Sequence, residues 1–159
     1  MSRKRFDNFN CSIAASLDQI GDWWTLMIVR EAFFGVRSFS GFQKNLGIAK
    51  NILTDRLEKL VGNGVFEKHV RAQDSRRYDY TLTEKGQDLF SVLVALMQWG
   101  DEWGGRKPPV YLAERTTGQV INKIKVSSAA GKDLKMRDVS VLPGPGATDE
   151  VRERFNKKS

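Results

Sequence analysis

Residues 41–64 read GFQKNLGIAKNILTDRLEKLVGNG, and residues 65–83 read VFEKHVRAQDSRRYDYTLT. The first segment predicts a short helix, a turn at Gly47 and a longer helix over about 49–61. Three leucines at spacings of four and three residues give the longer helix one apolar face: Leu53, Leu57 and Leu60. The second segment predicts a β-hairpin, because apolar and polar residues alternate on both sides of the polar loop AQDSRR. This order of elements is typical of a winged helix-turn-helix.

Local sequence signals indicate where these elements begin and end. Ser40 lies three residues before Gln43, which is the spacing of a capping box and predicts a helix from Gly41. Ala49 opens the longer helix without a side chain that could cap it. The hairpin is expected to turn at DSRR, so that Arg76 and Arg77 lie at its tip, where they could reach phosphates or simply remain solvated.

Amphipathic segments flank this central stretch. Residues 12–34 carry apolar residues three or four apart, with a break near Gly21, where Gly21 or Asp22 would cap the second part. Thr83 is the expected N-cap of a helix that starts at Glu84. This helix carries an apolar stripe that we predict forms a dimer interface: Leu89, Val92, Leu96, Trp99 and Trp103. The alternative is that the C-terminal segment covers the stripe.

The composition excludes several classes of protein. The 159 residues include 26 Lys and Arg against 19 Asp and Glu, a net charge of +7, which favours a polyanionic partner. One cysteine and one histidine exclude a disulfide framework and make a metal site or a catalytic triad very hard to build. No secretory signal, membrane span, nucleotide-binding loop or nucleophile elbow is recognisable. We therefore expect a cytoplasmic protein without a cofactor that is not an enzyme.

The chain is expected to consist of four parts. Residues 1–10 form a polar arm, and residues 11–105 form the helical domain with the hairpin. Residues 106–146 follow a Gly- and Pro-containing linker and carry short β-like runs, which predict a small strand-rich appendage. Residues 147–159 are polar and are expected to be a frayed tail. The predicted fold class is mainly α with a small β component.

Residues 11–103 resemble the HxlR-type winged helix-turn-helix transcriptional regulators, which are related to the MarR group. The matching positions, in order, are Cys11, Ile20-Gly21, Trp24-Thr25-Leu26, Arg30-Glu31, Phe39-Ser40-Gly41-Phe42, Leu53-Thr54-Asp55-Arg56-Leu57, Gly64-Val65-Phe66 and Tyr80-Thr81-Leu82-Thr83-Glu84-Lys85-Gly86. The resemblance implies a homodimer that binds double-stranded DNA, with the helix over 49–63 in the major groove and the hairpin alongside. Ala49, where the family often has Ser or Thr, and a hairpin without prolines depart from the pattern.

The expected DNA contacts follow from this layout. Base contacts are expected from the exposed side of the recognition helix: Lys50, Asn51 and Thr54. Backbone contacts are expected from residues around it and on the hairpin: Ser40, Gln43, Arg56, Arg71, Arg76 and Arg77. The alternative function is a winged-helix module that binds protein without DNA specificity.

Two further features have more than one interpretation. In some members of the family a cysteine at the place of Cys11 senses oxidants or electrophiles, whereas most free cysteines are small buried hydrophobes. An oxidant or a small molecule is therefore a candidate effector. The appendage resembles a zinc-ribbon-like tail whose cysteine positions are occupied by Thr117, Ser127 and Ala130, which predicts a metal-free remnant.

Overall fold

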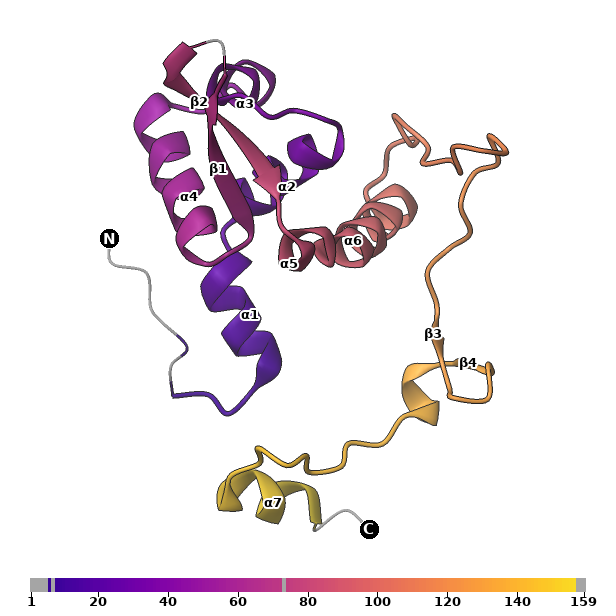
Figure 1. Ribbon diagram of the computed structural model, residues 1–159. Coiled ribbons are helices and arrows are strands. Elements are labelled where there is room, and N and C mark those ends of the chain that lie inside the picture. The colour runs from indigo at the N-terminus through magenta and orange to yellow at the C-terminus, as the bar shows by residue number, and fades with distance from the viewer. Residues whose placement is uncertain (1–5, 7, 73, 157–159) are drawn as a thin grey trace. The chain divides into compact units, whose positions relative to one another are not determined.

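The computed structural model describes residue 6, residues 8–72 and residues 74–156 (Figure 1). The described residues form two compact units. The first comprises the described residues up to 96 except 8–11, and the second comprises 8–11 together with the described residues from 97 onwards. The first unit is helical with an antiparallel hairpin, which confirms the predicted fold class. The assignment of separate domains to 11–105 and 106–146 stays a prediction.

The amphipathic N-terminal segment forms two helices, α1 (Ser12–Ile20) and α2 (Trp23–Phe33). Asp22 caps α2, because its side chain accepts a hydrogen bond from the Trp24 amide at 3.0 Å. The predicted break near Gly21 and the Asp22 alternative for the cap are therefore confirmed.

The helix-turn-helix consists of α3 (Phe39–Leu46) and α4 (Lys50–Gly62). Ser38, not Ser40, caps α3, since the Ser38 hydroxyl accepts from the Gly41 amide at 3.1 Å. The capping box predicted for Ser40 is wrong, and the helix begins two residues earlier than expected. Gly47 ends α3 with a φ of 60°, a left-handed conformation that costs a glycine little, and this makes the predicted turn.

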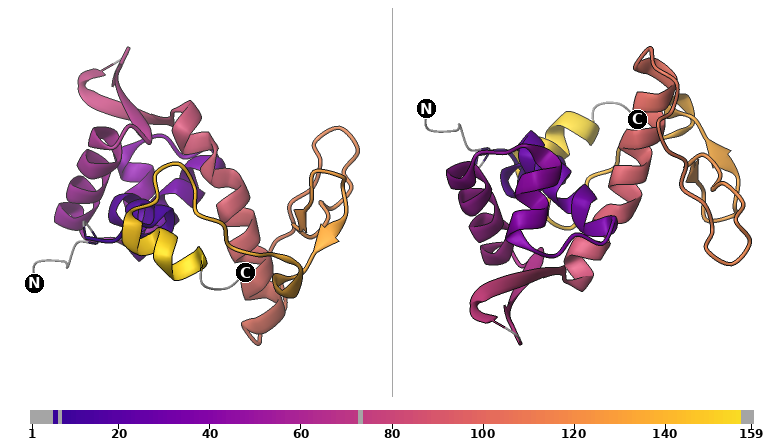
Figure 2. Two further views of the ribbon diagram at one scale, coloured as in Figure 1. Left: turned by 90° about the horizontal axis from the view of Figure 1, so that it is seen from below. Right: turned by 90° about the horizontal axis from the view of Figure 1, so that it is seen from above.

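The hairpin consists of β1 (Phe66–Arg71) and β2 (Asp74–Leu82) and projects beyond the helices in both views of Figure 2. Phe66 pairs with Leu82 and Val70 with Tyr78, after which the register shifts and Arg71 pairs with Asp74. The sequence DSRR therefore lies in β2 and not in the turn, which corrects the expected tip. Ala72, directly after β1, is in a turn, and residue 73 lies outside the described residues.

Directly after β2 in the chain, Thr83 caps α5 (Glu84–Gln87) by accepting a hydrogen bond from the Gly86 amide at 3.0 Å, as predicted. The helix then breaks at Asp88 before α6 (Leu89–Trp103) begins. Gly86 is buried at a point of close approach, where a Cβ atom would lie 2.2 Å from the Val65 carbonyl oxygen. Only glycine fits there without movement of the backbone.

The core of the first unit lies between α2, α3, α4 and the hairpin. The Phe42 ring packs edge-on against Phe66 and Tyr80, with ring centroids 6.3 and 6.5 Å apart. The other buried members come from the predicted apolar face of α4 and from its neighbours: Ile28, Val29, Ile48, Leu53, Leu57, Leu60 and Val65. This core fixes α4 with its other side at the surface.

The second unit has less regular structure than the predicted strand-rich appendage. It contains the short ladder of β3 (Val126–Ser127) with β4 (Asp133–Leu134), the 3-10 turn η1 (Met136–Asp138) and α7 (Asp149–Asn156). The β-like run at 139–142 forms no strand. The predicted frayed tail is instead helical over α7, where Asp149 and Glu150 occupy the first turn and favour a helix start.

Within the described residues, no helix is long and apolar enough to cross a lipid bilayer. In the same part of the chain, no three His, Cys, Asp or Glu side chains are grouped so that they could hold a metal ion.

Candidate nucleic-acid interface

The side of α4 that faces away from the core carries the predicted base-reading residues. Lys50 and Asn51 are exposed and Thr54 is half-buried. Together with Asp55 and Glu58 they line a shallow, open hollow of about 630 Å³. The Thr54 hydroxyl donates to the Lys50 carbonyl oxygen at 2.9 Å, which leaves its methyl group and its oxygen lone pairs to face a ligand. Lys50 and Asn51 are thus more available than Thr54 to donate hydrogen bonds to a ligand.

The N-terminus of α4 has no side-chain cap, as the alanine at position 49 predicts. Amide groups in the first turn of such a helix lack intrahelical partners and carry the positive end of the helix dipole. Lys50 adds its own charge to the same turn. This end of α4 is therefore electrostatically suited to an anionic group.

Arg56 makes an internal ion pair instead of facing solvent. Its Nε lies 2.8 Å from Asp22 Oδ1 and its Nη2 lies 3.0 Å from Asp22 Oδ2, and it also contacts Asp55. Both side chains of the Arg56–Asp22 pair are about four-fifths buried. The fork joins the start of α2 to the middle of α4, so the geometry does not favour the backbone contact predicted for Arg56.

The forked ion pair shifts the pKa values of both Asp22 and Arg56. Partial burial raises the pKa of the Asp22 carboxyl, but the hydrogen bond and charge of Arg56, with the Trp24 and Thr25 amides, outweigh it and leave the pKa lowered. The hydrogen bond that Arg56 donates to Asp22 likewise raises the pKa of Arg56. Both groups stay charged at neutral pH, which keeps α4 tied to α2.

A second hollow, of about 340 Å³, lies between the start of α3 and the hairpin. It is lined by residues that could hydrogen-bond to phosphate, with aromatic side chains between them: Ser38, Phe39, Ser40, Arg71, Arg76, Arg77, Tyr78 and Tyr80. Among the predicted backbone-contacting residues, it brings together Ser40 and the three hairpin arginines. Gln43 is half-buried on α3 and does not line it.

Two aspartates orient the hairpin arginines. Arg71 Nη2 lies 2.5 Å from Asp79 Oδ1, and Arg76 and Arg77 lie 3.5 and 3.2 Å from the two oxygens of Asp74. The hydrogen bond from Arg71 holds the pKa of Asp79 below its usual value. Three guanidinium groups against two carboxylates leave one positive charge in excess. Arg76, whose side chain is 91% exposed, is the one best placed to meet an external phosphate.

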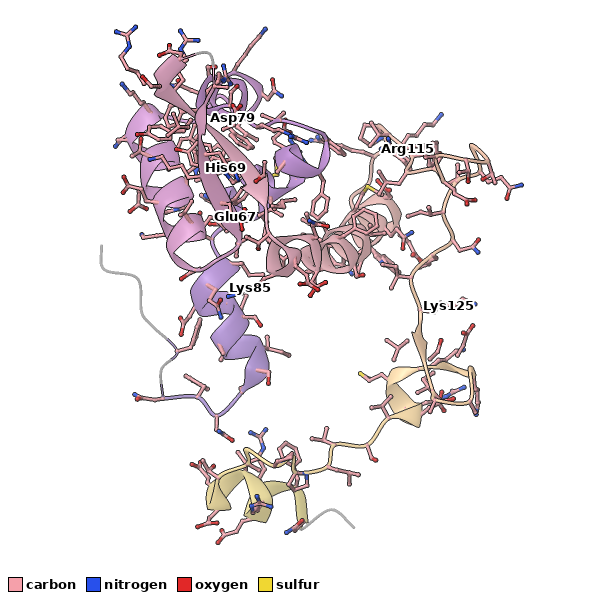
Figure 3. All side chains as sticks on the ribbon, in the orientation of Figure 1. Glu67, His69, Asp79, Lys85, Arg115 and Lys125 are labelled. Carbon is pink, nitrogen blue, oxygen red and sulfur yellow. The ribbon has the colours of Figure 1, made fainter. Side chains whose placement is uncertain are left out.

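One face of the hairpin carries charged side chains of both signs. Glu67, His69 and Asp79, labelled in Figure 3, belong to one face of the two-stranded sheet, where His69 pairs with Asp79 in the ladder. His69 Nε2 lies 3.0 Å from the Thr81 hydroxyl and 3.4 Å from Glu67 Oε2. Arg71 follows on the same face of β1, binds Asp79 and lines the hollow beside α3.

The predicted dimer stripe on α6 is largely at the surface. Its exposed members retain 49 to 69% of their accessible area: Val92, Leu96, Trp99 and Trp103. Leu89 differs, because it is half-buried against the core of the first unit and is better described as a core residue. On α1, Ile13 is 72% exposed, although it belongs to the apolar face of its helix.

Cys11 precedes α1 directly and is exposed as a free thiol. The interpretation of Cys11 as a small buried hydrophobe therefore does not apply to this single chain. An exposed thiol is open to oxidants and electrophiles.

Sequence reasoning missed Ser38, Asp74 and Asp79. Ser38 caps α3 and lines the arginine-containing hollow, and the two aspartates set the arginine geometry. Ser38 stands three residues before Gly41, a spacing at which it competes with Ser40 as a cap, so the signal was present but ambiguous.

Comparisons with known proteins identify this arrangement. The family model described as HxlR-like helix-turn-helix matches residues 19–108. The HTH-type transcriptional regulator Rv3095 of Mycobacterium tuberculosis, itself uncharacterised, is 42% identical over 85% of this chain and 87% of its own length. An uncharacterised HTH-type transcriptional regulator from Methanothermobacter thermautotrophicus is 28% identical over 64% of this chain and 78% of its own.

Solved structures agree with the sequence matches. PA1607, described as a candidate transcription factor, is 42% identical, superposes with a TM-score of 0.78, and the match covers 85% of this chain and 96% of that one. The redox regulator HypR in its oxidised form is 26% identical with a TM-score of 0.53, over 58% of this chain and 96% of that one. The chain thus shares its fold with winged-helix transcription factors. This chain belongs to the HxlR-like helix-turn-helix family and is a transcriptional regulator.

Proposed function

We propose that this regulator acts as a homodimer that binds double-stranded DNA in a sequence-specific manner. The observation that carries the proposal is the placement of α4, which buries its leucine face in the core and leaves Lys50 and Asn51 exposed over an open hollow. An α-helix of this kind fits the major groove, where each base pair presents its own pattern of donors and acceptors.

In this proposal Lys50, Asn51 and Thr54 read the bases. An asparagine side chain can bind adenine through two hydrogen bonds, and a lysine can bond to the O6 or N7 atom of guanine. Thr54 would contribute its methyl group, because its hydroxyl already donates to the Lys50 carbonyl. Asn51 is therefore the residue on which base preference should depend most.

Backbone contacts would come from the hollow beside α3. Arg76 and Arg77 supply exposed guanidinium groups, Ser40 an exposed hydroxyl, and Arg71 a guanidinium held in place by Asp79. Gln43 lies on the same helix as Ser40 and would act at longer reach. Such contacts set register and affinity without reading sequence. Arg56 would support the interface from within, by holding α4 against α2.

The homodimer would form through the exposed apolar side chains of α6. Val92, Leu96, Trp99 and Trp103 recur at helical spacing and remain at the surface, an apolar stripe that a lone soluble chain seldom exposes. A two-fold pair of recognition helices would read two half-sites about one helical turn apart. Ile13 adds apolar surface on α1.

The proposed function also includes regulation of DNA binding by an oxidant. Its support is the exposed thiol of Cys11 and the likeness to HypR, a redox regulator by its name. A mixed disulfide, a sulfenic acid or a bond between the two Cys11 thiols of a dimer would change the surface at the start of α1. A Cys11→Ser variant whose DNA affinity responds to oxidant as the wild type does would remove this component.

Selection from a random duplex library, followed by binding curves in rising salt, tests the function. We expect an enriched site with two-fold symmetry and an affinity that falls steeply with salt. The alternative, a module that binds protein, predicts no enriched site and no retention on a DNA column. That outcome would overturn the proposal.

A further inference from the structure

The second unit contains a hollow of about 320 Å³ that plays no part in the proposed DNA interface. The C-terminal half of α6 supplies one wall and the segment 108–123 supplies the other: Met97, Gln98, Asp101, Glu102, Pro108, Tyr111, Leu112, Val120, Ile121 and Lys123. Its volume is at the lower end of the range for small-ligand pockets.

The walls of this hollow are held by hydrogen bonds, so its shape does not depend on a ligand. The side-chain amide of Gln98 donates through Nε2 to the Asn122 backbone carbonyl at 3.0 Å. Its Oε1 accepts from the Ile124 backbone amide at 2.8 Å. Across the segment, the Ile121 amide donates to the Leu112 carbonyl at 2.9 Å, next to the bridge between Ala113 and Val120. A preformed site binds a small ligand at a lower cost in ordering.

The floor is apolar and half-buried. Met97, Leu112 and Ile121 are half-buried, while the Tyr111 ring stands at the rim with 67% of its area exposed. An apolar group that displaces water from these side chains would gain hydrophobic stabilisation. The aromatic rim adds a face over which a cation is attracted.

The charges of the hollow select one class of ligand. Lys123 pairs with Glu102, which neutralises both groups. Asp101 is half-buried and, within the described part of the chain, makes no ion pair. One net negative charge therefore remains in this hollow, on a chain whose total charge is +7. A nucleic-acid phosphate would be repelled here, and a ligand with one positive charge would be attracted.

We propose that this hollow is a binding site for a small amphiphilic monocation, an aromatic or alkyl amine. The ammonium group would lie against the Asp101 carboxylate and the Tyr111 ring. The apolar part would cover Met97, Leu112 and Ile121. The site is independent of the proposed DNA contacts and can be tested without DNA.

Three probes of one shape separate charge from hydrophobicity: 4-phenylbutylamine, 4-phenylbutanol and 4-phenylbutyrate. Calorimetry and amide chemical-shift mapping on the full chain measure binding of each. We expect the amine to bind at least several-fold more tightly than the alcohol and the carboxylate to bind most weakly. The shifts should concentrate at 97–123. Equal affinities, or no shifts in this range at millimolar amine, would overturn the proposal.

Variants of the chain complete the test. Asp101→Asn should weaken amine binding about fivefold to tenfold and leave the alcohol unchanged, because the substitution removes only the charge that faces the ammonium group. Val120→Trp should fill the hollow and weaken all three probes. Asp88→Asn removes an equal charge outside the hollow and should have no effect. If Asp101→Asn binds the amine as the wild type does, the assigned site is wrong. Circular dichroism confirms that each variant is folded.

Discussion

Asp22 caps α2 and at the same time holds Arg56 of α4 through a forked ion pair, with Nε to Oδ1 at 2.8 Å and Nη2 to Oδ2 at 3.0 Å. One carboxylate thus accepts hydrogen bonds from the amide of Trp24 and from the guanidinium group of Arg56. Because α4 carries the proposed base-reading residues, this pair adds to the core packing that holds them in place.

Replacement of Asp22 separates its two roles. Asparagine caps a helix nearly as well as aspartate but cannot form the forked ion pair with Arg56, so Asp22→Asn should lower the free energy of unfolding by about 1 kcal/mol. Asp22→Ala removes the cap as well and should cost about 2 kcal/mol. Urea unfolding at neutral pH measures both. Equal losses for the two variants would contradict the division of roles.

The ion pair predicts a pH dependence of known sign. The pKa of Asp22 is lower in the folded chain than its ordinary value of 3.8. Its stabilisation is therefore complete above pH 3.8 and is lost as the pH falls through the lower folded value. The difference in unfolding free energy between wild type and Asp22→Asn should be constant from pH 5 to 8 and shrink below pH 3.8. A difference that shrinks between pH 5 and 8 would contradict this assignment.

Gly86 predicts a steric effect. An alanine Cβ there would lie 2.2 Å from the Val65 carbonyl oxygen and 2.9 Å from Leu82 Cδ2, so the backbone must move. We expect Gly86→Ala to lower the unfolding free energy by about 2 kcal/mol or more. Gly62→Ala is the matched control, since nothing lies within 4 Å of its Cβ, and it should be neutral or slightly stabilising. Thermal unfolding measures the stability of both variants. A Gly62→Ala variant less stable than Gly86→Ala would contradict the close approach of Gly86 to the Val65 carbonyl oxygen.

The hairpin arginines predict a change in salt dependence. Replacing Arg76 and Arg77 together by Ala should weaken binding to all duplexes alike and reduce the log–log salt slope by about 0.9 for each phosphate that is no longer neutralised. Replacing Lys132 and Arg137 by Ala removes the same charge from the second unit and should leave the slope almost unchanged. Fluorescence anisotropy at several salt concentrations gives both slopes, and identical slopes would exclude the hairpin from the interface.

The stripe on α6 predicts the oligomeric state. Leu96→Glu places a charge among exposed apolar side chains that we expect to be buried between two copies, so the dimer should dissociate. Ala95→Glu, at an exposed neighbouring position, is the control and should remain dimeric. Light scattering on the eluted peak measures both masses. A monomeric wild type, or two dimeric variants, would contradict the proposed interface.

The parts of the fold that follow from short-range chemistry could be predicted from the sequence. The turn at Gly47, the leucine face of α4 and the Thr83 cap each depend on residues within a few positions of one another. The Ser38 cap could not be chosen over Ser40, because both fit the local pattern. Ser38 also bridges to Asp79, which lies 41 residues away.

The site was less predictable, because Arg56 depends on a distant partner and the composition of DSRR does not reveal its strand. The helical pattern placed Arg56 near the exposed side of α4, but Asp22, on another helix, holds it. DSRR has the composition of a turn, yet Asp74 accepts from the Arg76 amide and pairs with Arg77, within an extended strand. Leu89 fits the stripe by spacing, whereas packing places it against the core.

Base preference of wild type and Asn51→Ala on one randomised duplex library tests the central claim most directly. The account predicts that the wild type enriches a two-fold symmetric site and that Asn51→Ala keeps every preference except one base pair in each half-site. Lys44→Ala removes an exposed cation from α3 and should retain the complete preference. An unchanged site for Asn51→Ala would contradict the assignment of α4 as the reading helix.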